Sequence, residues 1–89
     1  MKLDAGLHGP LGAAGDRARV IEKFGYDGVI SSEIDHDPFF PLLLAAETTE
    51  RVDLMTGIAV AFARNPMLLA NIGWDLHHHS GGRFVLGLG

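Results

Sequence analysis

Short apolar runs alternate along this chain with longer segments in which apolar residues recur every three or four positions. The runs are mostly rich in β-branched and small residues and are bounded by turn-forming residues, a pattern typical of strands. They cover residues 2–7, 26–32, 52–61 and 83–89. The periodic segments predict helices from about residue 13 to 24, from 38 to 49 and from 66 to 79. This order predicts parallel strands joined by helical crossovers.

Capping residues support the predicted limits of the helices. Asp37-Pro38 and Asn65-Pro66 each place an N-cap residue before a proline at the first helical position. Gly25 stands where a left-handed helix cap favours glycine, and Ser80-Gly81-Gly82 ends the third helix. In the first helix, the apolar stripe that should face the core consists of Ala14, Ala18, Ile21 and Phe24.

The last three strands are nearly continuous apolar runs, which is typical of a parallel sheet covered on both faces. Strand–helix alternation fits a closed barrel or an open doubly wound sheet. A dinucleotide-binding sheet would carry G-x-G-x-x-G after its first strand, whereas residues 8–15 read His-Gly-Pro-Leu-Gly-Ala-Ala-Gly. Pro10 also removes one backbone donor. We therefore predict an α/β fold, the N-terminal half of a (β/α)8 TIM barrel, as one partial domain over residues 1–89.

Composition narrows the functional classes. The 89 residues have a net charge of -4 and only seven scattered Lys and Arg residues, which argues against nucleic-acid binding. The chain has no Cys, which excludes disulfides and thiolate metal sites. On a helix, His77, His78 and His79 point about 100° apart, so one metal ion could not bind all three. We therefore expect no metal. Because no signal-like or membrane-length apolar segment is found, we also expect a cytoplasmic protein without membrane contact.

Three segments, in this order and spacing, resemble the bacterial luciferase-like superfamily. They are Gly25–Val29, Thr56–Pro66 and Ser80–Gly89. The segment Glu33-Ile-Asp-His-Asp-Pro-Phe39 is similar to the deazaflavin-dependent oxidoreductases of actinobacteria within that superfamily. The resemblance covers the whole chain but only the N-terminal part of a family member. It implies a barrel that binds coenzyme F-420 (8-hydroxy-5-deazaflavin), or alternatively FMN, at its C-terminal mouth.

The resemblance also implies which residues contact the cofactor. Family members have a non-prolyl cis peptide bond in a bulge at the end of the third strand, which would fall at Gly57-Ile58. Such a bond costs about 3–4 kcal/mol and persists only where its surroundings hold it. The simpler interpretation is that Gly57 bends a barrel strand. By the resemblance, Gly57, Ile58 and Ala59 would bind the cofactor, with Glu33 accepting a hydrogen bond near the ring.

Catalytic and substrate-binding roles are implied for three further residues. Relatives often have an Asp-His pair at the end of the second strand, where this chain has Glu33-Ile34. The acid–base role would therefore pass to His36, which could instead be a solvated loop residue. His8 at the end of the first strand and Phe62 after the third could line a substrate pocket. The alternatives are a packing or solvent-facing role for His8 and an ordinary core position for Phe62.

These features leave three functional hypotheses. The first is an oxidoreductase that transfers a hydride between a deazaflavin coenzyme and a small organic substrate. The second is an FMN-dependent monooxygenase of the same superfamily. The third is a non-catalytic oligomerising half barrel, because half a barrel leaves apolar faces and strand edges open. We therefore expect a small-molecule substrate and, as protein partner, either a second copy in a homo-oligomer or a missing C-terminal half.

Overall fold

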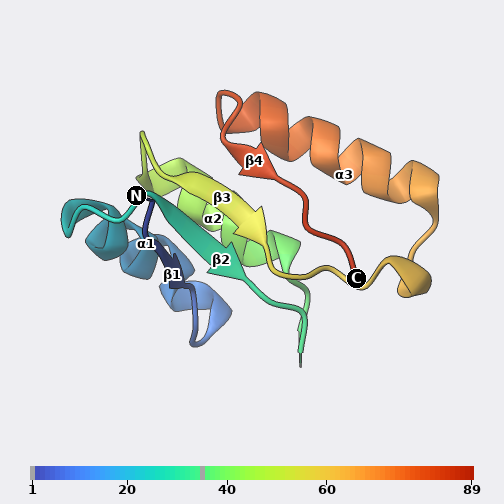
Figure 1. Ribbon diagram of the computed structural model, residues 1–89, viewed down its shortest axis with the longest axis horizontal. Helices are drawn as coiled ribbons and strands as arrows, with labels where there is room; N and C mark the ends of the chain where they lie inside the picture. The colour runs from blue at the N-terminus through green and yellow to red at the C-terminus, as the bar shows by residue number, and fades with distance from the viewer. Residues whose placement is uncertain (1, 35) are drawn as a thin grey trace.

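Strands and helices alternate from one end of the chain to the other (Figure 1). The computed structural model describes residues 2–34 and 36–89. Within these residues the strands are β1 (Asp4–Gly6), β2 (Gly28–Ser31), β3 (Asp53–Thr56) and β4 (Phe84–Val85). The α-helices are α1 (Ala14–Lys23), α2 (Phe39–Thr48) and α3 (Pro66–His79), with short 3-10 helices η1 (Leu11–Ala13) and η2 (Ala61–Ala63). None of the described helices is long and apolar enough to cross a membrane.

The strands form one parallel sheet in the order β1-β2-β3-β4. Val29, in β2, lies opposite Ala5 on one side and Leu54 on the other. A doubly wound sheet reverses its strand order at a switch point, whereas strands that follow one another in sequence order are typical of a barrel. The predicted N-terminal half of a (β/α)8 barrel is therefore confirmed.

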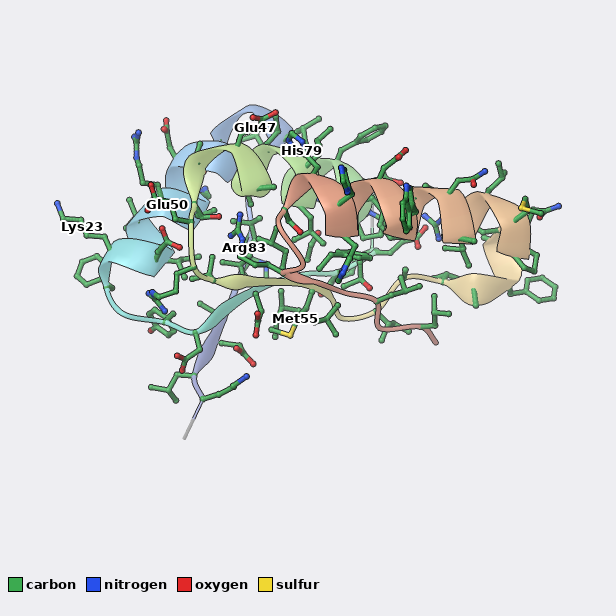
Figure 2. The ribbon with its side chains drawn as sticks, turned by 90° about the horizontal axis from the view of Figure 1, so that it is seen from above. Lys23, Glu47, Glu50, Met55, His79 and Arg83 are labelled. Atoms are coloured by element: carbon green, nitrogen blue, oxygen red, sulfur yellow. The ribbon has the colours of Figure 1, made fainter. Side chains whose placement is uncertain are left out.

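The hydrophobic core lies between the sheet and the layer of helices above it (Figure 2). Side chains alternate along each strand, so Val29 and Leu54 point toward the helices and are completely buried. The helices cover them with small and aliphatic side chains: Ala14, Ala18, Leu42, Ala45, Leu69 and Leu76. The other face of the sheet, on which Figure 2 shows Met55, carries no helix among the described residues.

Several predicted limits are wrong, because the strands are shorter than the apolar runs that predicted them. The predicted fourth strand, 83–89, has regular strand pairing only in β4. The predicted third strand, 52–61, ends at Thr56, because the backbone then leaves the sheet direction and forms η2. Beyond β3 and β4, an isolated parallel bridge joins Ala59 to Leu88. Phe24 does not belong to the buried stripe of the first helix, since α1 ends at Lys23 and the Phe24 residue is 77% exposed.

The predicted start of the third helix is confirmed, and that of the second is one residue early. The Asn65 side chain accepts a hydrogen bond from the Met67 N–H over 2.7 Å. Asp37 Oδ2 accepts hydrogen bonds from the N–H groups of Phe39 and Phe40 over 2.7 and 2.8 Å. Helix α2 therefore has its predicted cap, although it begins at Phe39 rather than at the preceding proline.

Two long side chains tie the helix layer to the amino end of the sheet. Glu22, on α1, accepts hydrogen bonds from the N–H groups of Glu50, Arg51 and Val52. Burial raises the pKa of Glu22, but these three donors outweigh burial and leave its pKa below the ordinary value. Arg83 lies between the sheet and the helices (Figure 2) and donates to carbonyl groups at the end of α2. Both residues satisfy backbone groups that the helix and strand ends leave open.

Candidate functional site

The carboxyl ends of the strands meet at one edge of the sheet, which we call the mouth: the segments that directly follow β1, β2, β3 and β4. In a barrel this edge carries the chemistry. The residues predicted from the ends of the first three strands lie there: His8, Glu33, Gly57, Ile58 and Ala59. Phe62 follows in η2, and His36 lies in the loop before α2. The fold thus brings the predicted residues to one edge.

The segment Gly57–Ala61 forms a wall in the mouth. Its Gly57-Ile58 peptide bond is cis, as the family resemblance predicted. On the β2 side, the Gly57 N–H donates to the Ser31 carbonyl over 2.9 Å. The Ser32 hydroxyl donates to the Gly57 carbonyl over 2.6 Å. The first residue of the wall is therefore held through both of its backbone polar groups.

The wall is also held on the β4 side. The Ala59 N–H donates to the Gly87 carbonyl over 2.8 Å, and the Gly89 N–H donates to the Ala59 carbonyl over 3.1 Å. The Gly87 N–H donates to the Thr56 hydroxyl over 2.8 Å. A Cβ atom on Gly87 would overlap the Thr56 carbonyl, so only glycine lets the two segments approach this closely. The wall continues the parallel arrangement after the regular strands have ended.

Glu33 directs its carboxylate into the protein. Its N–H donates to the Ile58 carbonyl over 3.2 Å, and its Oε1 accepts from the Val60 N–H over 2.8 Å. Arg64 donates to Oε1 through Nη1 and to Oε2 through Nη2, the latter over 3.0 Å. Arg64 Nη1 also donates to the Val60 carbonyl over 2.9 Å. Glu33 and Arg64 therefore bind both polar backbone groups of Val60.

The Arg64 side chain is enclosed by its partners. It is 15% exposed, its Cζ lies 5.1 Å from the centre of the Phe39 ring, and its Nη2 lies 3.6 Å from Asp37 Oδ1. The hydrogen bond from Arg64, with that from the Val60 N–H, holds the pKa of Glu33 below its ordinary value. The hydrogen bond to Glu33 in turn raises the pKa of Arg64. Both groups are therefore charged at neutral pH.

Arg64 is not among the site residues predicted from the sequence. Its signal is weak but real: it is the one charged residue between Asp53 and Asp75. A lone charge in an apolar stretch requires a partner or an exposed position. The sequence does not show which acid supplies that partner, because Glu33 belongs to a different loop.

The three predicted catalytic and substrate-binding side chains are exposed at the mouth. His36 has its Nδ1 3.3 Å from the Asp37 carbonyl. The His8 ring lies against Gly6, where a Cβ would overlap it. Phe62 is 100% exposed and is therefore not a core residue. Among the described residues no hydrogen bond joins one of the three to another, and their roles stay predictions. The resemblance motif also contains Asp35, which lies outside the described residues.

The wall offers a surface that suits a flat aromatic ring. Ile58 is 47% exposed there. Gly87 brings the backbone close to the same surface. A flavin or deazaflavin ring is largely apolar with polar edges, so the wall fits such a ring. The phosphate end would need another partner, since Arg64, the cation that lies against the wall, is bound by Glu33.

Apart from the wall, the surface is hollowed between α2 and α3. The apolar lining of this hollow includes Phe40, Leu43, Ile72 and Leu76. Beside it, His79 and Glu47, both labelled in Figure 2, approach to 3.2 Å. Asp37, which lies 3.6 Å from Arg64, also lines this hollow.

A parallel half barrel with a hydrogen-bonded wall at the carboxyl ends of its strands has the architecture of TIM-barrel proteins, a class whose members bind ligands at that edge. The profile of the family described as luciferase-like monooxygenase matches residues 2–89. The chain belongs to this family. The resemblance seen in the sequence is therefore confirmed.

Curated relatives are longer than this chain. The uncharacterized protein Rv1360 of Mycobacterium tuberculosis is 56% identical over 89 residues, which are 100% of this chain and 26% of that protein. The putative coenzyme F420-dependent oxidoreductase Rv3520c of the same organism is 39% identical over 69 residues, covering 76% of this chain and 20% of that protein. The chain thus spans 20–26% of the length of these relatives.

Solved structures show the same fold. Monooxygenase RslO1 from Streptomyces bottropensis matches with a TM-score of 0.88 and 26% identity, over 99% of this chain and 32% of that one. The oxygenating constituent of 3,6-diketocamphane monooxygenase from Pseudomonas putida, solved in complex with FMN, matches with a TM-score of 0.88 and 19% identity. That match covers 100% of this chain and 29% of the other. At this identity, the second match shows the fold alone.

Proposed function

We propose that this chain supplies the ring-binding wall of a deazaflavin-dependent oxidoreductase. The observation that carries the proposal is the wall itself, an apolar surface with half-exposed Ile58 at the carboxyl ends of the strands. The 39% identity of the chain to a putative coenzyme F420-dependent oxidoreductase supports the choice of a deazaflavin ring over FMN. When bound, a deazaflavin supplies hydride transfer between its ring carbon C5 and a small organic substrate.

The chain's own residues would bind and orient the ring and its substrate. Gly57 and the half-exposed Ile58 would form the surface against which the ring rests, whereas Ala59, predicted to bind the ring as well, is completely buried and would only support that surface. If the His36 Nδ1–H donates to the Asp37 carbonyl 3.3 Å away, Nε2 is left free to accept a proton. His8 and the exposed Phe62 would contact the substrate from two sides of the mouth.

A second candidate is an FMN-dependent monooxygenase of the same family. One solved structure of this fold holds FMN. In addition, 4-hydroxyprotoasukamycin monooxygenase of Streptomyces nodosus subsp. asukaensis is 33% identical over 84 residues. A third candidate is a non-catalytic half barrel that self-associates through its open sheet face.

Fluorescence titration of the chain with coenzyme F-420, and separately with FMN, distinguishes these candidates. The proposal expects tighter binding of F-420. Tighter binding of FMN would favour the monooxygenase. Binding of neither at high micromolar concentration, by a chain that forms a defined oligomer, would favour the non-catalytic half barrel.

A pair of matched variants tests whether binding occurs at the wall. Ile58→Asp should weaken binding about tenfold or more, because it places a charge against the apolar ring. Phe24→Ser removes an apolar side chain that is more exposed, 77% against 47%, but lies at the other end of the sheet. It should leave binding unchanged. Equal effects of the two variants would place binding away from the wall.

A further inference from the structure

The ion pair of Glu33 and Arg64 joins the two loops on either side of the wall. Glu33 follows β2 and Arg64 precedes α3, 31 residues later in the sequence. Their side chains are 22% and 15% exposed. Each carboxylate oxygen of Glu33 already accepts a hydrogen bond from the protein. The carboxylate of Glu33 is therefore paired with groups of the protein rather than directed at a ligand.

The backbone of the wall needs this support, because the strand ladder has ended. The ladder between β2 and β3 ends at the pair Ser31–Thr56. On the β4 side an isolated bridge follows at Ala59, and the Ala61 N–H donates to the Gly89 carbonyl over 3.1 Å. Val60, which is half-buried, lies beyond that bridge and outside any described strand. An unpaired backbone N–H or carbonyl in such a position is costly. The hydrogen bonds from Val60 to Glu33 and from Arg64 to Val60 replace the missing ladder.

We propose that Glu33 and Arg64 are positioning residues, which orient Ile58 toward the bound ring through Val60 without touching the ring. This inference rests on the proposed function. It also revises the role predicted for Glu33 from ring contact to support of the wall. The guanidinium is needed in this role, since Arg64 binds both carboxylate oxygens and the Val60 carbonyl at once. A lysine ammonium cannot reproduce that planar fork.

Glu22 provides a matched control for Glu33. Both are glutamates that accept backbone N–H groups from a different element, and both have a lowered pKa. Glu22, however, binds residues before β3, at the amino end of the sheet. Glu22→Gln and Glu33→Gln therefore remove equivalent charges at opposite ends of the sheet. A positioning role predicts different consequences for the two, whereas a general stabilising role predicts similar ones.

The experiment compares wild-type chain with Glu33→Gln, Arg64→Lys and Glu22→Gln by three measurements. These are urea denaturation, hydrogen exchange of the Val60 amide, and fluorescence titration with F-420 and with FMN. In Glu33→Gln and Arg64→Lys, the Val60 amide should exchange about tenfold faster or more, and affinity for the better-bound cofactor should fall about tenfold. The emission maximum of the bound ring should also shift, because the wall is displaced. Glu22→Gln should change only the denaturation midpoint.

Each alternative outcome has a defined meaning. If Glu33→Gln weakens binding but leaves Val60 exchange unchanged, Glu33 contacts the cofactor directly and the positioning role is overturned. Equal losses of affinity in the Glu22 and Glu33 variants would show that Glu33 and Arg64 only stabilise the fold in general, which also overturns the positioning role. If the wild-type chain binds neither cofactor, the proposed function fails. Val60 exchange then still decides whether the pair holds the wall.

Discussion

Replacing Arg83 by Met removes a guanidinium that donates five hydrogen bonds at the amino end of the sheet. Nε donates to the Ser80 carbonyl over 2.7 Å. Nη1 donates to the Thr49 hydroxyl and the Val52 carbonyl over 2.9 and 3.0 Å. Nη2 donates to the Thr49 and Ala46 carbonyls over 3.1 and 3.4 Å. Methionine keeps an apolar stem of similar course, so the change isolates the charged head.

The expected loss follows from the acceptors that remain. A hydrogen bond to a charged group contributes about 1.5–3 kcal/mol, but bonds that share one donor group do not add. The better guide is the number of buried acceptors left without a donor. Thr49 and Val52 are 6% and 0% exposed. At about 1–3 kcal/mol for each of these two unsatisfied buried carbonyls, Arg83→Met should lower the free energy of unfolding by about 2–6 kcal/mol.

Urea denaturation at pH 7, followed by far-ultraviolet circular dichroism, measures this loss. Arg83→Lys keeps the charge and can reach only some of the acceptors, so it should lose about 1–2 kcal/mol. Arg19→Met is the matched control, because Arg19 is exposed and bonds Asp16 on its own helix. It should change stability by less than about 0.5 kcal/mol. The reasoning is refuted if Arg83→Met falls within that range too, or if lysine serves as well as arginine.

Three further predictions concern packing, pH and association. Gly87→Ala should lower the free energy of unfolding by about 1–3 kcal/mol, because the added Cβ would overlap the Thr56 carbonyl. Gly12→Ala places its Cβ in open space and should leave stability unchanged. Equal thermal midpoints for the two variants would contradict this. Stability should fall as pH drops below about 4.3, because Glu22 and Glu33 have lowered pKa values in the folded chain and the unfolded chain then binds protons that the folded chain does not. Urea midpoints between pH 7 and pH 3 test this, and the Gln variants should have flatter profiles. At micromolar concentration the light-scattering mass of the chain should exceed that of a monomer, since the open sheet face and strand edges are unpartnered in the described chain. A stable monomer would contradict this.

The fold was predictable because local signals agreed with one another. Asp37 and Asn65 precede prolines and cap their helices as expected. The missing phosphate signature near Pro10 favoured a barrel over an open sheet, and the strand order agrees. Phe24 was wrongly predicted to be buried, because it continues the apolar spacing of the first helix although the helix has already ended. Periodicity identifies a stripe but does not show where a helix terminates.

The site was predictable in its backbone and less so in its side chains. The position of the wall followed from the family resemblance, which implied a bulge at Gly57-Ile58. The partner of Glu33 did not, because Arg64 lies 31 residues away and only the folded chain brings the two loops together. The sequence therefore suggested that the Glu33 carboxylate binds a ligand, whereas in the folded chain it already pairs with Arg64. Contacts between loops of different strands are the part that local patterns do not contain.

The two ends of the sheet use the same chemistry for different purposes. At the amino end, Glu22 and Arg83 satisfy the backbone groups that regular helices and strands leave open, so their effect is on stability. At the carboxyl end, Glu33 and Arg64 bind a backbone segment that belongs to no regular element, so their effect is on the shape of the mouth. Carboxylate and guanidinium variants at the amino end should therefore change unfolding without changing cofactor affinity. A variant there that altered affinity at constant stability would show that the sheet transmits strain between its ends, and the two ends could not then be treated as independent.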